Sequence, residues 1–251
     1  MKNKLYYNKS LGNIYLKPSL KSEIVSQILY GEKFTIIKKQ KDWLKIKLNF
    51  DNYVGYIKNS SFTEKFYPTL KVKNLSAKTF QLKKERFIRL KQKIFFGSKI
   101  MVLKKYGNYF EFEKNKWINK KDLIIKDHIE KNYIKILKLF LNTKYLWGGR
   151  SADGIDCSAL IQIFFFYNNK FFPRDTKDQI KFCKAKKNKK FNQGDIIFWK
   201  GHVGICANKK DFLHAYGPRK KVLIMNTLKT IELIEKTANL KVKKITNISK
   251  Y

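Results

Sequence analysis

The spacing of apolar residues changes along this chain near residue 127, and this change limits the folds that the chain can adopt. Before that point, short runs such as Trp43–Leu48 alternate apolar and polar residues with a period of two, as half-buried strands do. After it, apolar residues recur with helical spacing and predict an amphipathic helix over residues 129–143. We therefore expect an α+β chain in which all-β domains precede one mixed domain.

Residues 1–66 contain five short β-rich runs separated by turn residues, among them Gly12, Pro18 and Gly31. Five short strands in so few residues predict a small barrel. The runs of residues 67–126 repeat this order more weakly. Gly97 and the apolar run after it lie 66 residues beyond Gly31 and its run, which indicates a second, divergent copy of the module. A single irregular β domain is the alternative.

Residues 127–251 have the composition of an α+β domain of helices packed on an antiparallel sheet. After the first amphipathic helix, the apolar run from Cys157 to Tyr167 predicts a buried helix. Three short strands are expected at residues 195–199, 202–207 and 211–216. A helix over 227–238 and a strand near 240–248 are expected to close the chain.

The chain of 251 residues has 56 basic and 19 acidic residues, a formal net charge of +37. Such an excess predicts attraction to polyanions. Only five of the basic residues are Arg, although planar recognition of bases and phosphates favours Arg over Lys. We therefore expect no nucleic-acid partner and interpret the charge as a solvated lysine surface. The alternative, a nucleic-acid-associated basic protein, predicts binding with a steep salt dependence.

The first nine residues turn polar almost at once, and no apolar window approaches the length of a membrane span. Three cysteines do not form a disulfide framework. We therefore expect a cytoplasmic protein without a secretory signal or membrane span. No second His or Cys stands at metal spacing from Cys183 or Cys206, and ordinary packing is the expectation for both.

One cysteine and two histidines stand where nucleophilic catalysis would need them. Cys157 follows Asp156 at the expected start of a buried helix, where partial positive charge lowers a thiol pKa and unpaired N–H groups can bind an oxyanion. His202 and His214 lie on adjacent expected strands, so one imidazole could take the thiol proton and the other could orient it. Structural Cys and His residues are commoner, so this pattern alone is weak.

Six blocks in order make the signal specific, and with them the chain resembles the NlpC-type (NlpC/p60) papain-like cysteine peptidases. The blocks are YLWGG at 145–149, GIDCSAL at 154–160, PRDT at 173–176 with Gln179, GDIIF at 194–198, GHVGI at 201–205 and LHA at 213–215. The two N-terminal modules resemble bacterial SH3-like domains. The whole arrangement resembles γ-D-glutamyl-diamino-acid endopeptidases.

The resemblance implies Cys157 as the nucleophile, His202 as the general base and His214 as the residue that orients it. Tyr145, with the Cys157 N–H, would stabilise the oxyanion. Substrate contacts are implied for two groups of residues, Asp156, Ser158, Trp147 and Thr176 in the peptidase domain, and Tyr53 and Asp51 in the first SH3-like module.

The sequence departs from the family pattern at Ala159, where the family has Gly, and in the loop Tyr216-Gly217-Pro218, which puts substrate detail in doubt. Arg174 could pair with a diaminopimelate carboxylate or with Asp175, and both possibilities stay open.

The resemblance implies a cysteine peptidase that needs no metal or organic cofactor. It would hydrolyse the γ-D-glutamyl–meso-diaminopimelate bond of short peptidoglycan peptides with a free N-terminal L-Ala, in murein peptide recycling. Two alternatives remain. One is a weakly catalytic or non-catalytic protein that binds cell-wall fragments, and the other is an amidase or acyltransferase of the same fold.

Overall fold

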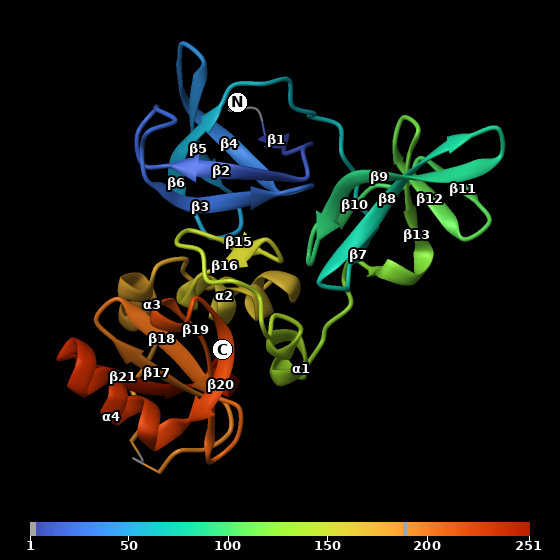
Figure 1. The fold of residues 1–251 in the computed structure, drawn as a ribbon. Coiled ribbons are helices and arrows are strands. Elements are labelled where there is room, and N and C mark those ends of the chain that lie inside the picture. Colours follow the sequence, from blue (N-terminus) through green and yellow to red (C-terminus); the bar gives the residue numbers. More distant parts are fainter. Residues whose placement is uncertain (1–3, 188–189) are drawn as a thin grey trace. The chain divides into compact units, whose positions relative to one another are not determined.

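The computed structural model describes residues 4–187 and 190–251, so residues 1–3 of the expected first domain lie outside the described residues (Figure 1). The chain divides into two units. One comprises Met1–Glu130 with Tyr167–Asn169, and the other comprises Lys131–Phe166 with Lys170–Tyr251. The first unit is built from strands, and the second combines helices with an antiparallel sheet. The expected fold class, α+β with an all-β SH3-like region first, is confirmed.

The first sheet of the N-terminal unit has six strands in the order β1-β4-β5-β6-β2-β3. Its strands are β1 (Lys4–Tyr6), β2 (Leu11–Tyr15), β3 (Ile24–Leu29), β4 (Lys33–Gln40), β5 (Trp43–Leu48) and β6 (Val54–Lys58). The period-two pattern of β5 buries Leu44, Ile46 and Leu48 in one apolar core. Five strands were expected here, and β1 is the addition.

Two further sheets complete the first unit, in the orders β10-β7-β14 and β11-β12-β13-β8-β9. Their strands are β7 (Leu70–Val72), β8 (Ser76–Lys83), β9 (Arg86–Phe95), β10 (Lys99–Ile100), β11 (Lys104–Tyr106), β12 (Tyr109–Glu113), β13 (Lys116–Asn119) and β14 (Leu123–Ile125), with the 3₁₀ turn η1 (Lys120–Asp122) before β14. Residues from β7 to β14 share a second apolar core. Lys71 donates to the carbonyl oxygens of His128 and Tyr167 at 2.6 Å each, which attaches residues 167–169 to this unit.

The two glycines that indicated a repeat make matching turns. Gly31 and Gly97 both have positive φ, 74° and 78°, and each turn closes with an N–H bonded three residues back, Glu32 to Leu29 and Ser98 to Phe95. The strands that follow differ, since β4 has eight residues and β10 only two. The division of this unit into domains 1–66 and 67–126 stays a prediction, as does the boundary at 127.

The second unit is formed by a five-stranded antiparallel sheet in the order β20-β19-β18-β17-β21. Its strands are β17 (Asp195–Trp199), β18 (His202–Cys206), β19 (Asp211–Tyr216), β20 (Lys221–Asn226) and β21 (Lys244–Asn247), and a two-stranded ribbon joins β15 (Arg150–Ser151) to β16 (Gly154–Ile155). The helices are α1 (Tyr133–Lys138), α2 (Cys157–Tyr167), α3 (Thr176–Phe182) and α4 (Thr227–Ala238), with 3₁₀ turns η2 (Gly217–Arg219) and η3 (Ile248–Lys250). α4 packs Ile234 against Trp199, Phe212 and Tyr216 of the sheet.

Most of the expected elements of this unit are present, and one is wrong in length. The helix expected over residues 129–143 is only α1, six residues long. Asn132 caps its start, and after Lys138 the N–H groups of Leu139 and Phe140 bond three residues back, so the chain continues as tight turns. β20 and α3 were not expected. Within the described ranges, no helix is both long and apolar enough to cross a membrane.

Candidate active site

Cys157 is the first residue of α2 and is buried, with 3% of its surface exposed. The preceding residue, Asp156, caps the helix. Its carbonyl accepts the Leu160 N–H at 3.0 Å, and its Oδ1 accepts the Ala159 N–H at 2.8 Å, as an N-cap side chain does. The N–H groups of a first helical turn have no partner within the helix, so the N–H of Cys157 is placed to serve as an oxyanion donor.

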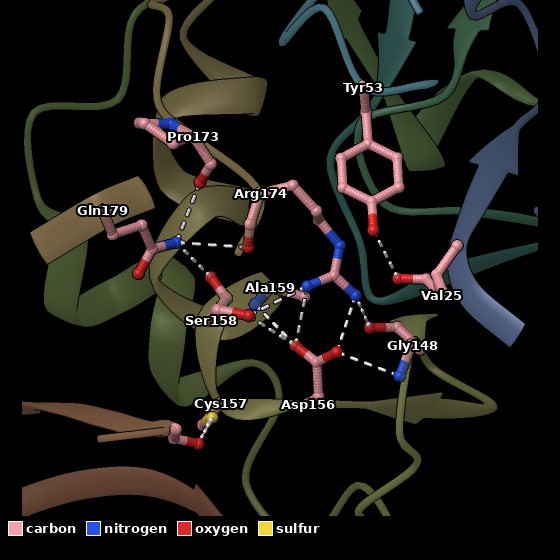
Figure 2. A network of polar contacts seen from close by, with 12 residues as sticks. Val25, Tyr53, Gly148, Asp156, Cys157, Ser158, Ala159, Pro173, Arg174 and Gln179 are labelled. Atoms are coloured by element: carbon pink, nitrogen blue, oxygen red, sulfur yellow. Dashed lines mark hydrogen bonds and ion pairs between the residues drawn. The ribbon is translucent and has the colours of Figure 1, made fainter. Parts of the chain in front are cut away.

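A buried ion pair holds this helix start in place (Figure 2). Nη2 of Arg174 donates to Oδ2 of Asp156 at 2.6 Å, and Nη1 donates to Oδ1 at 3.0 Å. The Gly148 N–H also donates to Oδ2, at 3.0 Å, and Ser158 Oγ donates to Oδ1, at 3.1 Å. The two-point contact of Arg174 joins the segment before α3 to the start of α2, and the Gly148 contact joins the loop before β15 to it; together they position Cys157.

Asp156 is a partner of Arg174 that the sequence analysis did not name. Arg174 forms an ion pair with Asp156, and the two side chains are 1% and 7% exposed. Ser158 and Thr176 are also buried, whereas Trp147 is 57% exposed. Contacts of Asp156, Ser158, Thr176 and Trp147 with a substrate stay predictions.

Burial raises the pKa of the Cys157 thiol to about 12, and the negative charge of Asp156 acts in the same direction. The backbone of Val203, the hydroxyl of Thr176 and the Arg174 charge lower it by less. The helix N-terminus was expected to lower this pKa, but the net shift is upward, because loss of hydration on burial disfavours the thiolate. At neutral pH the group is a thiol, and its proton must leave during attack.

The thiol lies beside the start of β18, where His202 stands. Cys157 Sγ is 3.9 Å from the carbonyl oxygen of Gly201, and the backbone of Val203 also interacts with it. Both chain neighbours of His202 thus contact the thiol. The structure brings the predicted nucleophile and the predicted base to one place.

The two histidines are in direct contact, and their contacts define the tautomers. His202 Nε2 lies 3.0 Å from His214 Nδ1, and His214 Nε2 lies 3.4 Å from Met225 Sδ. A thioether sulfur can only accept a hydrogen bond, so His214 Nε2 carries the proton and Nδ1 accepts from His202 Nε2–H. In the neutral ring this leaves His202 Nδ1 as the basic nitrogen.

Both imidazoles are neutral at physiological pH. Burial lowers the pKa of His202 to about 4, and burial together with the charge of His202 lowers that of His214 to about 3. Aromatic rings pack against both histidines. The Tyr216 ring stacks on His214 with ring centroids 4.7 Å apart, and the ring centroids of Trp199 and His202 are 5.6 Å apart. Burial of both groups thus favours their neutral forms, a thiol on Cys157 and a neutral base on His202.

Tyr145 and His202 line the same cavity, whose volume is about 530 Å³. Burial raises the pKa of Tyr145, and the charges of Cys157 and Asp156 raise it further. The phenol therefore stays protonated and able to donate. Its electrostatic interaction with Cys157 shows that the two side chains lie near each other, and the oxyanion role of Tyr145 stays a prediction.

Tyr53 and Asp51 belong to the N-terminal unit. Asp51 Oδ1 accepts the Tyr53 N–H at 3.0 Å in the turn between β5 and β6, and the Tyr53 hydroxyl donates to the Val25 carbonyl at 3.4 Å (Figure 2). Their predicted contribution to the substrate site stays a prediction.

Met225 is the contact of this site that sequence reasoning missed. No sequence pattern marks it, because its position depends on the register of β19 and β20. His214 pairs with Leu223, and Met225 stands two residues further on the same face. Within the described part of the chain, no three His, Cys, Asp or Glu side chains gather as a candidate metal site.

Comparison with known proteins agrees with this geometry. Residues 142–238 match the NlpC/P60 family, and residues 14–62 match the bacterial dipeptidyl-peptidase SH3 domain. Dipeptidyl-peptidase 6 from Lysinibacillus sphaericus is 24% identical over 233 residues, which cover 82% of this chain and 84% of that protein. The γ-D-glutamyl-L-lysine dipeptidyl-peptidase of Bacillus subtilis is 25% identical over 234 residues, 83% of this chain and 77% of that protein.

The fold is shared with a solved NlpC/P60 family protein from Bacillus cereus, with a TM-score of 0.80, 18% identity and coverage of 97% of this chain and 99% of that one. Residues 142–238 thus form a domain that matches the NlpC/P60 family of cysteine peptidases, and residues 14–62, which match the bacterial SH3 domain, precede it.

Proposed function

We propose that this chain hydrolyses the γ-D-glutamyl–meso-diaminopimelate bond of short peptidoglycan peptides with a free N-terminal L-Ala. One observation carries the proposal: the Cys157 thiol contacts both neighbours of His202, and His202 Nε2 lies 3.0 Å from His214 Nδ1. A buried thiol beside a base in a fixed tautomer is the arrangement that acyl transfer requires.

In the first half of the reaction, His202 Nδ1 takes the thiol proton as Cys157 sulfur attacks the γ-carbonyl carbon of D-Glu. The carbonyl π electrons move to oxygen, and the Cys157 N–H and the Tyr145 hydroxyl donate hydrogen bonds to the resulting oxyanion. The C–N bond then breaks, and the proton on His202 passes to the leaving amine. The products are the free diamino acid and a thioester on Cys157.

In the second half, His202 removes a proton from water as the oxygen attacks the thioester carbon. A second oxyanion forms and collapses, the C–S bond breaks, and the thiolate takes the proton back from His202. The dipeptide L-Ala-γ-D-Glu leaves. Because the thiol pKa is raised, the covalent intermediate forms only by coupled proton transfer to His202.

The names of two relatives support cleavage at a γ-D-glutamyl bond and the position of that bond, and they give L-lysine as the amino acid that follows. Proteins of Bacillus subtilis and Bacillus cereus, 25% and 23% identical to this chain, are named γ-D-glutamyl-L-lysine dipeptidyl-peptidase. This name describes a γ-D-glutamyl bond two residues from an N-terminus. It supports a substrate peptide with a free N-terminal amine. The contacts that we propose for this peptide are Asp156, Ser158, Thr176 and Trp147 in the peptidase domain and Asp51 and Tyr53 in the SH3-like domain.

A peptide with a free N-terminal L-Ala is a product of murein turnover, so the proposal includes a role in murein peptide recycling in the cytoplasm. The three cysteines are unpaired and buried, which suits a reducing compartment.

The test is incubation of the full chain with L-Ala-γ-D-Glu-meso-diaminopimelate, followed by mass spectrometry. Release of diaminopimelate by the wild type and not by Cys157→Ala is expected, and an N-acetylated peptide should resist cleavage. His202→Gln should be as inactive as Cys157→Ala. Cleavage that survives Cys157→Ala would refute the mechanism, and no cleavage of the free-amine peptide would refute the proposed substrate.

A further inference from the structure

The cavity of about 530 Å³ beside His202 has two unlike walls. One contains Tyr145 and His202. The other is an apolar face of α4 that includes Leu233 and Ile234. The turn η2 also lines the cavity. Its last residue, Arg219, is the one charged side chain that lines the cavity within the described residues.

The leaving amino acid must enter this cavity if the proposed function is right, and the present inference depends on that function. His202 gives its proton to the leaving amine, so the leaving residue lies against His202 at the moment of bond cleavage. The cavity that His202 lines is therefore the place for its side chain, and methylene groups suit the apolar face of α4.

The turn that carries Arg219 is held firmly to the site. The Tyr145 N–H donates to the Lys220 carbonyl at 2.8 Å, and the Val222 N–H donates to the Thr143 carbonyl at 2.8 Å. Lys220 adopts a left-handed conformation with φ of 55°, which closes the turn. Arg219 thus stands three residues after Tyr216, whose ring stacks on His214.

The guanidinium of Arg219 is exposed, and in the described ranges no hydrogen bond or ion pair engages it. No carboxylate lines the cavity within those ranges. A side chain ending in a carboxylate would find a partner there, since guanidinium binds carboxylate at two points. A side chain ending in an ammonium would find no partner and would be repelled.

We propose that Arg219 binds the side-chain carboxylate of the leaving diamino acid, and so selects diaminopimelate over lysine. The loop Tyr216-Gly217-Pro218, at which this chain departs from the family pattern, is the segment that presents Arg219. The relatives whose names specify L-lysine would therefore differ from this chain in the leaving diamino acid that they accept.

The test measures binding without turnover. The Cys157→Ala chain is titrated by calorimetry with L-Ala-γ-D-Glu-meso-diaminopimelate, with the corresponding L-Lys peptide, and with the diaminopimelate peptide amidated at its side-chain carboxylate. Binding of the diaminopimelate peptide should be about tenfold tighter than that of the other two, the usual effect of one charge-assisted contact. Adding Arg219→Gln should remove the difference, and Arg219→Lys should restore part of it.

Arg89→Gln is the matched control, because Arg89 is an exposed Arg on β9 and does not line the cavity. It should leave the tenfold difference intact. Equal binding of the three peptides, or a difference that survives Arg219→Gln, would overturn the inference. An equal loss for the diaminopimelate and L-Lys peptides would also overturn it, because it would place Arg219 on the α-carboxylate that both share.

Turnover of the same peptides by the wild type is measured in parallel. A binding difference that requires Arg219, with no cleavage of any peptide, would refute the proposed function and support the inference.

Discussion

Replacement of Arg174 by Met should destabilise the peptidase unit by about 3–5 kcal/mol, the cost of removing one partner of a buried ion pair. Arg174 and Asp156 are 1% and 7% exposed, and two N–H···O contacts of 2.6 and 3.0 Å join them. Without Arg174, the Asp156 carboxylate keeps the Gly148 and Ala159 N–H groups and loses its only ion-pair partner in the described part of the chain. Met keeps most of the volume, so the lost charge dominates the effect.

The three cysteines provide a readout for this unit alone. Cys157, Cys183 and Cys206 all lie in the second unit, and each is at most 3% exposed. Their labelling by a thiol reagent during a urea titration therefore reports the unfolding of that unit, whatever the N-terminal unit does. With a denaturant slope of about 2 kcal/mol/M, the midpoint for Arg174→Met should fall by about 2 M.

Arg219→Met is the matched control, since it removes an exposed Arg of the same unit, and it should change stability by less than about 0.5 kcal/mol. Asp156→Asn, which keeps the helix cap, should restore about 2 kcal/mol when combined with Arg174→Met, because it removes the buried unpaired charge. A loss below about 1 kcal/mol for Arg174→Met, or strict additivity of the two changes, would refute the reasoning.

Three further predictions concern the histidine pair. Protonated His202 cannot accept the thiol proton, and burial lowers the pKa of His202 to about 4. The acid limb of a plot of kcat/KM against pH should therefore have its midpoint near pH 4, and a midpoint near pH 6.5 would contradict this. Gly204→Ala would place a Cβ 2.4 Å from the Phe212 ring and 2.7 Å from His214 Cβ, so kcat should fall by about a hundredfold while circular dichroism still shows a folded chain. Met225→Leu removes the acceptor of the His214 N–H, so kcat should fall by about tenfold with KM unchanged. Met225→Gln should recover part of the lost kcat. An unchanged kcat in the Leu variant would refute the tautomer argument.

The elements that the sequence predicted well are those with local signals. Helix α4 begins and ends where its apolar spacing indicated, at Thr227 and Ala238, and β19 occupies the expected residues 211–216. Asn226 caps α4 through the Lys229 N–H, and Asn239 ends it in a left-handed conformation. Such stop and start signals act within a few residues and can be identified without tertiary information.

The errors come from effects that act over longer distances. The apolar spacing over residues 129–143 continues past the end of α1. The last residues of this range do not extend the helix, because they bond with β20, as the Asn142 N–H does with the Val222 carbonyl. The direction of the Cys157 pKa shift was wrong because a helix N-terminus is a local signal, whereas burial depends on everything packed around the thiol.

The sequence by itself determined the fold class, the family and the identity of Cys157, His202 and His214 as candidates, because these follow from ordered blocks and local periodicity. Only the tertiary structure decided that Arg174 pairs with Asp156, that Met225 defines the tautomer of the pair, and which wall of the cavity carries charge. The physical reason is that each of these depends on strand register or on burial, and both bring together residues whose separation in the chain carries no signal.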